Sequence, residues 1–156
     1  MLYAAWKTAH LLAIVVWIGG MVFTHFFLRP ALAPLDAPVR LRLMHDVLGR
    51  FFRAVLVATL VVLASGLWMI GRSAGEAAQT GGVFSMPFGW SVMATLGVVM
   101  VAIFMHIRFA LYKRLSRAVA ASDWPAGGAA LARIRQWVGV NLSLGIVVLL
   151  VVLLRF

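Results

Sequence analysis

Four long apolar runs constrain the fold of this chain more than any other feature of its sequence. They cover residues 3–28, 51–71, 88–111 and 137–154, and each is long enough as a helix to cross about 30 Å of hydrocarbon. The composition agrees, because 64% of the 156 residues are hydrophobic and only 12% are charged, whereas soluble domains are about half apolar. We therefore expect an all-α integral membrane protein. Residues 1–156 would form a single four-transmembrane-helix bundle without a separate soluble domain.

The basic residues are distributed unevenly about these runs. Eleven of the fourteen basic residues lie at the ends of the runs on one side, namely Arg29, Arg40, Arg42, Arg50, Arg53, Arg108, Lys113, Arg114, Arg117, Arg133 and Arg135. The other side holds Lys7, Arg72 and Arg155. The positive-inside rule predicts that the arginine-rich side is cytoplasmic and that both termini face outward. The net charge of +10 then serves to orient the protein in the membrane, and the basic side chains attract anionic lipid headgroups. No nucleic-acid partner is therefore expected.

The sequence lacks cysteine and a cleavable signal, and each of these absences limits what the chain can be. The chain has no cysteine, which excludes disulfides, thiolate copper sites, iron–sulfur clusters and covalently attached haem. The first apolar run is too long for a cleavable signal and lacks a basic n-region, so we expect it to remain as a span.

Helix-breaking residues predict where the spans end. Arg29–Pro30 is expected to end the first span, because proline cannot continue a helix. A helix then restarts near Val39 and leads into the second span, which is expected to end at Gly71–Arg72 before a glycine-rich outer loop over residues 73–87. The third span continues into a basic amphipathic stretch, and Asp123–Trp124–Pro125 makes the turn to the fourth.

Histidines inside apolar spans are the strongest functional signal, because ionisable groups in a bilayer are costly. His10 and His25 lie on the first span about 60° apart around the helix and about 22 Å apart along it, so that each leaflet holds one imidazole. His106 lies on the third span at the depth of His25. A pair of imidazoles on facing helices suits a six-coordinate haem b. Its propionates would pair with arginines at the same rim, for which the candidates are Arg29, Arg53 and Arg108.

His10 has no histidine partner at its depth. Met69, Met93 or Met86 would complete a His/Met site there, or a second haem would be five-coordinate. Met86, Met93 and Met100 form a heptad-spaced stripe that points more than about 100° away from His106 and is typical of packing or lipid contact. His45 lies beside Asp46 in the interface, where a histidine is usually no more than a polar surface residue.

The two halves of the chain resemble each other in outline. Each has a span with a histidine near its arginine-rich end, then a basic re-entry and a second span. His25 is followed by Arg29, and His106 by Arg108. The pattern suggests a parallel repeat about an axis along the membrane normal, with His25 and His106 facing each other across it.

Three segments carry a resemblance to a known family. They are KTAHLLAIVVWIGGMVFTHFFLRPAL, LGRFFRAVLVATLVVLASGLWMI and FMHIRFALYKRLSRAVAASDWPAGGAALARIRQWVGVNLSLG. Together they resemble the small four-span members of the CopD family, which is associated with bacterial copper resistance. The resemblance implies a multi-pass protein of the bacterial inner membrane, in which the outward-facing termini expected from the charge distribution would be periplasmic. It also implies a role in copper or haem homeostasis.

A fainter resemblance points to HemJ-type protoporphyrinogen oxidases, which are four-span haem proteins. Lys7 and His10 match their Lys-x-x-His opening, and Trp17 matches the aromatic continuation. Those proteins use a lysine in the third span, whereas this chain has none there before Lys113. That difference argues against the same activity.

Three functions follow from these observations. The first is a b-type cytochrome with one or two haems bound through His25, His106 and His10, exchanging electrons with a quinone or a periplasmic redox protein. Whether it would be an oxidoreductase component or would dimerise stays open. The second is a copper-binding or copper-transporting permease, since Cu(I) accepts thioether and imidazole ligands. The third is a scaffold without a cofactor, which leaves the embedded histidines unexplained.

Overall fold

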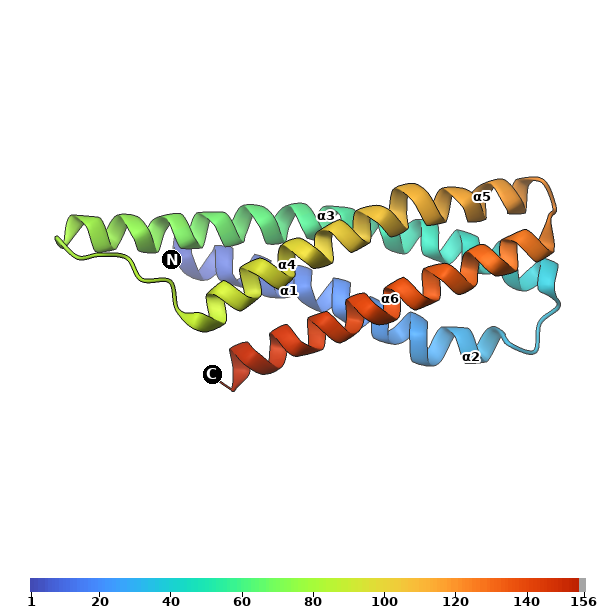
Figure 1. The fold of residues 1–156 in the computed structure, drawn as a ribbon, viewed down its shortest axis with the longest axis horizontal. Coiled ribbons are helices and arrows are strands. Elements are labelled where there is room, and N and C mark those ends of the chain that lie inside the picture. Colours follow the sequence, from blue (N-terminus) through green and yellow to red (C-terminus); the bar gives the residue numbers. More distant parts are fainter. Residues whose placement is uncertain (155–156) are drawn as a thin grey trace.

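The computed structural model describes residues 1–154; Arg155, which the charge pattern assigns to the outer side, lies outside the described residues. All the secondary-structure elements of residues 1–154 are helices (Figure 1). α1 (Leu2–Val22), a π-helical turn (Phe23–Leu28) and α2 (Arg29–Leu32) form the first long helix, and α3 (Ala37–Gln79) is the second. α4 (Phe88–His106), a π-helical turn (Ile107–Leu111) and α5 (Tyr112–Ala120) form the third, and α6 (Trp124–Leu153) is the fourth. Each is long and apolar enough to cross a membrane, which confirms the all-α, four-span expectation.

The outward-facing surface of the bundle is apolar. Large aliphatic side chains are exposed on all four long helices, among them Leu12, Val15, Val57, Leu60, Leu67, Val98, Val147 and Leu150. Exposed side chains of this kind are soluble in hydrocarbon, and helices satisfy their own backbone hydrogen bonds there. The protein is therefore a multi-pass membrane protein whose outer surface contacts lipid.

Two helices extend beyond their predicted ends. α3 continues past Gly71–Arg72 as far as Gln79, because the segment is alanine-rich and the Arg72 guanidinium pairs with Glu76 one turn later at 2.7 Å. The outer loop therefore covers residues 80–87 only. The first helix passes through Arg29–Pro30 and ends at Leu32, with the π-helical turn directly before the proline, which lacks an N–H donor.

The two π-helical turns occupy matching places in the two halves of the chain. The first contains His25, and the second begins directly after His106. π-Helical turns are rare and occur mostly at functional sites. Their positions agree with the repeat that the sequence suggests.

The bundle consists of two helix pairs. α1 packs most extensively on α3, and α4 packs most extensively on α6. The pairs join around a core of fully buried side chains toward the arginine-rich end, which includes Leu48, Phe52, Val55, Phe104, Ile107, Leu115, Ile134 and Val138. Both termini and the α3–α4 loop point toward the opposite end of the elongated bundle (Figure 1). Between the pairs, on that side of the core, lies a partly open cavity.

Candidate functional site

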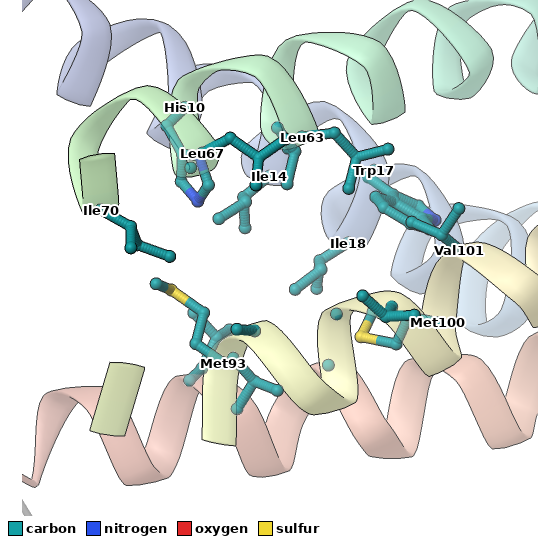
Figure 2. Close-up of a pocket in the computed structure, with 18 residues that line it drawn as sticks. His10, Ile14, Trp17, Ile18, Leu63, Leu67, Ile70, Met93, Met100 and Val101 are labelled. Carbon is teal, nitrogen blue, oxygen red and sulfur yellow. The ribbon is translucent and has the colours of Figure 1, made fainter. Parts of the chain in front are cut away.

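An apolar cavity of about 160 Å³ lies between the two helix pairs. Its walls come from α1, α3, α4 and α6, and they are formed by aliphatic side chains such as Ile14, Ile18, Leu63, Ile70 and Val101. His10 is the one ionisable side chain that lines it. Figure 2 shows the imidazole reaching into this space from α1. A cavity lined almost entirely by apolar side chains holds few water molecules.

Ser65 on α3 holds the His10 ring in place. His10 Nδ1 lies 2.7 Å from Ser65 Oγ, and both residues are buried, with 6% and 0% of their surfaces exposed. Ser65 Oγ also lies within hydrogen-bond reach of the backbone carbonyls of Val61 and Val62, to which its hydroxyl can donate. With the hydroxyl donating to either carbonyl, Ser65 Oγ accepts a hydrogen bond from Nδ1–H of His10.

This hydrogen-bond arrangement corresponds to one tautomer of His10. With its proton on Nδ1, a neutral imidazole carries a lone pair on Nε2. His10 Nε2 is buried and has no hydrogen-bond partner. An orphaned lone pair of this kind is costly unless something binds it, and a histidine oriented through its other nitrogen is the usual form of a metal ligand.

Two methionine side chains of α4 form part of the cavity wall across from His10. Met93 and Met100 line the cavity one heptad apart, and the Met93 side chain enters it opposite His10 (Figure 2). Imidazole nitrogen and thioether sulfur are ligands that Cu(I) accepts. His10 and Met93, one of the sequence-predicted combinations, thus line the same cavity, and Met100 lines it as well.

Glycines leave room on both walls of the cavity. A Cβ atom at Gly66 would lie 3.6 Å from His10 Cε1, and a Cβ atom at Gly97 would meet nothing within 4 Å. A side chain at either position would narrow the space beside the imidazole.

His25 and His106 are not brought together in this structure. A Cβ atom at Gly139 of α6 would lie 3.8 Å from His25 Cε1, whereas the exposed His106 packs edge-on against Trp137 at 5.4 Å between ring centroids. Positions 137 and 139 of α6 point about 160° apart around the helix axis. The two imidazoles therefore lie on different sides of α6, and in this arrangement they do not offer one iron two axial ligands.

The three arginines predicted to hold propionates are also dispersed. Arg29 lines a separate hollow near the arginine-rich end, and Arg53 is exposed on α3. Arg108 lies over the rings of Phe109 and Tyr112, with its guanidinium carbon 5.5 Å and 5.3 Å from their centroids. These three arginines do not converge on one site.

The remaining candidates lie outside the cavity. Met69 is buried in α3 and Met86 precedes α4, and neither lines the cavity wall. Both ring nitrogens of His45 have hydrogen-bond partners. Asp46 Oδ1 lies 3.1 Å from Nδ1, and Ser116 Oγ lies 3.0 Å from Nε2. That agrees with its interpretation as an interfacial polar residue. Among residues 1–154, no three His, Cys, Asp or Glu side chains gather as a metal site.

Sequence reasoning missed Ser65, the residue that orients His10. A single hydroxyl in the middle of the apolar run VVLASGLWM was the available signal. Small polar residues in spans commonly bond across helices. Identifying His10 as the partner requires the register of α1 against α3, which the sequence does not provide.

Comparison with known families gives one match. The family model described as copper resistance protein D (CopD) matches residues 45–155, more than half of the chain. Comparison with curated proteins and with solved structures gives no significant match. On the family match, together with the four apolar helices, this chain belongs to the copper resistance protein D family.

Proposed function

We propose that this protein binds Cu(I) in the cavity between its helix pairs, as a copper-handling membrane protein of the copper resistance D family. His10 Nε2 and the thioether sulfur of Met93 are the proposed ligands. The observation that carries the proposal is the buried Nε2 of His10, which has no partner and faces a cavity that Met93 also lines. Family membership supports copper as the ion.

The ligand chemistry favours Cu(I) over other metals. Zinc sites use three or four cysteine, histidine or carboxylate ligands, and His10 is the one such side chain at this cavity. Thioether and imidazole are neutral, soft or borderline ligands that suit Cu(I). A monovalent ion also carries less charge into an apolar space than a divalent ion, and burying charge is the main cost of such a site.

Haem b is the second candidate, and one observation favours it. Gly66 beside His10 and Gly97 on the far wall leave flat, uncrowded surfaces, against which a planar ring would fit. The size of the cavity disfavours it, because about 150 Å³ accommodates a single benzene ring, and the cavity measures about 160 Å³. A haem would require the helix pairs to separate. Electron transfer to a quinone or a periplasmic redox protein would require this second candidate, haem b, to be bound.

A titration of detergent-purified protein with Cu(I) against a competing chelator tests the proposal. We expect wild-type protein to bind one Cu(I). We expect His10→Gln to weaken binding by more than about 100-fold, because loss of a group that merely orients a ligand already costs about 10- to 100-fold. Met93→Leu should weaken binding as well while conserving volume, and Met86→Leu and His106→Gln serve as matched controls.

The same samples distinguish copper from haem. A visible spectrum recorded before and after dithionite reduction will show a Soret band if haem b is bound as purified. A colourless protein that binds Cu(I) through His10 supports the copper proposal. A haem-containing protein with Cu(I) binding unaffected by His10→Gln would overturn it in favour of the cytochrome.

We place the protein in the bacterial inner membrane with its arginine-rich end in the cytoplasm. The family membership and the distribution of basic residues support this orientation. The copper cavity would then lie in the half of the bundle nearer the periplasm.

A further inference from the structure

A second hollow lies near the arginine-rich end of the bundle and is separate from the copper cavity. It has a volume of about 560 Å³, and its basic lining consists of His25, Arg29, Arg40 and Arg135. These residues come from three parts of the chain: the π-helical turn and α2, the start of α3, and α6. Folding therefore gathers three guanidinium groups and an imidazole around one space.

No acidic side chain balances this charge. The ion pairs within residues 1–154 are His45–Asp46 and Arg72–Glu76, and neither involves the hollow. Arg40 donates a hydrogen bond to the backbone carbonyl of Ala33 at 3.2 Å, which anchors its guanidinium at the rim. Like charges held around one cavity repel each other, and a bound anion is the simplest way to offset that repulsion.

The imidazole of His25 is also incompletely bonded. Its Nδ1 atom is buried and has no hydrogen-bond partner. His25 on the π-helical turn and Arg29, the first residue of α2, lie about one turn apart and line the hollow together. The two side chains thus place an imidazole and a guanidinium beside each other on the same wall.

We propose that this hollow binds a phosphate group, supplied either by the headgroup of an anionic phospholipid or by free phosphate. Guanidinium groups bind phosphate oxygens through paired hydrogen bonds, and three of them line the site. Arg29 directly follows the first apolar run, so the hollow lies at the depth of lipid headgroups, where basic side chains attract anionic lipids. Phe26, Leu32 and Met44 complete the wall with apolar surface against which an acyl chain can pack.

A bound phosphate group would account for the gathering of Arg29, Arg40 and Arg135 around one hollow. Charge topology alone does not require basic side chains to share one hollow, and Arg53 and Arg133 do not line it. The phosphate site does not depend on the copper proposal, since the two cavities share no lining residue.

Thermal unfolding of delipidated, detergent-purified protein tests the proposal, with tryptophan fluorescence as the readout. The protein is titrated separately with phosphatidylglycerol, phosphatidylcholine and inorganic phosphate. We expect phosphatidylglycerol to raise the Tm of wild-type protein more than phosphatidylcholine does. We expect Arg135→Gln to weaken the apparent affinity by about 10-fold or more, as the loss of a charged hydrogen bond to phosphate predicts.

Arg133→Gln is the matched control, because it removes the same charge from the same helix at a position outside the hollow. Without added ligand, Arg135→Gln should be at least as stable as wild-type protein, since it relieves repulsion between basic groups. His25→Gln provides a second variant should Arg135→Gln not fold.

The outcomes separate the two sources of phosphate. Stabilisation by phosphatidylglycerol alone assigns the site to a lipid headgroup, and stabilisation by inorganic phosphate as well assigns it to the phosphate group itself. If Arg133→Gln and Arg135→Gln weaken the apparent affinity equally, the effect comes from general surface charge, and the proposal is overturned. Failure of both phosphate compounds to stabilise wild-type protein would also overturn it.

Discussion

His10 Nδ1 lies 2.7 Å from Ser65 Oγ, and this hydrogen bond between α1 and α3 leaves the other imidazole nitrogen, on a side chain that lines the cavity, without a partner. The Ser65 hydroxyl can donate to the Val61 or Val62 carbonyl and so accept from Nδ1–H of His10. Metal-binding histidines are usually oriented in this way, through a hydrogen bond at the nitrogen that does not bind the metal.

Replacing Ser65 therefore tests the orientation of His10 without touching a proposed ligand. We expect Ser65→Ala to weaken Cu(I) binding about 10- to 100-fold, the usual cost of losing a group that orients a histidine ligand. Chelator competition measures the change. Ser143→Ala is the control, because Ser143 is exposed on α6 and bonds only to the Gly139 carbonyl of its own helix. Equal affinities for wild-type protein and Ser65→Ala would contradict the assigned tautomer.

Gly20 sets the close contact between α1 and α3. A Cβ atom at Gly20 would lie 2.1 Å from Phe51 Cε2, whereas a Cβ atom at the neighbouring Gly19 would meet nothing within 4 Å. We expect Gly20→Ala to lower the free energy of unfolding by about 1–3 kcal/mol through overpacking. Gly19→Ala should be neutral or slightly stabilising. Denaturation in detergent measures both, and partial rescue of Gly20→Ala by Phe51→Leu would identify the contact.

Tyr112 joins α5 to α3 beneath the arginine-rich surface. Its hydroxyl donates to the backbone carbonyl of His45 at 3.1 Å, and its ring stacks on the His45 imidazole at 5.2 Å between centroids. We expect Tyr112→Phe to lower the free energy of unfolding by about 0.5–1.5 kcal/mol, the net value of one hydrogen bond. Tyr3→Phe, at an exposed ring near the N-terminus, should leave stability unchanged. A loss as large for Tyr3→Phe would show that the effect is not specific to the α3–α5 contact.

The orientation in the membrane can be measured cleanly because the chain has no cysteine of its own. Single cysteines at Gln79 and Arg117 place one exposed thiol at each end of the bundle. In spheroplasts, a membrane-impermeant maleimide should label Gln79→Cys at once and Arg117→Cys only after lysis, because the positive-inside rule places the arginine-rich end in the cytoplasm. The reverse labelling pattern would contradict the predicted topology.

The four spans were predictable from the sequence because they depend on the length of apolar runs. Each run of that length must satisfy its backbone as a helix in hydrocarbon. The helix ends were less predictable. Arg29–Pro30 and Gly71–Arg72 look like stops, yet a π-helical turn carries the first helix onward and the Arg72–Glu76 pair supports the second.

The site was predictable only in part. The presence of His10 in an apolar run marked it as a candidate functional residue, and Met93 was one of its candidate partners. The relation of His25 to His106 was not predictable, because matching depth does not fix which side of α6 each imidazole approaches. Rotation of each helix about its own axis is set by packing across the bundle. Ser65, Arg40 and Arg135 likewise gain their significance only through contacts that are distant in sequence.

X-ray absorption at the copper K-edge of Cu(I)-loaded protein examines the proposed site most directly, because it distinguishes nitrogen from sulfur ligands. Wild-type protein should show both nitrogen and sulfur in the first coordination shell. The nitrogen contribution should be lost in His10→Gln and the sulfur contribution reduced in Met93→Leu, while Met86→Leu keeps the wild-type spectrum. A shell that contains only nitrogen and oxygen, or one that His10→Gln leaves unchanged, would contradict copper binding between the helix pairs.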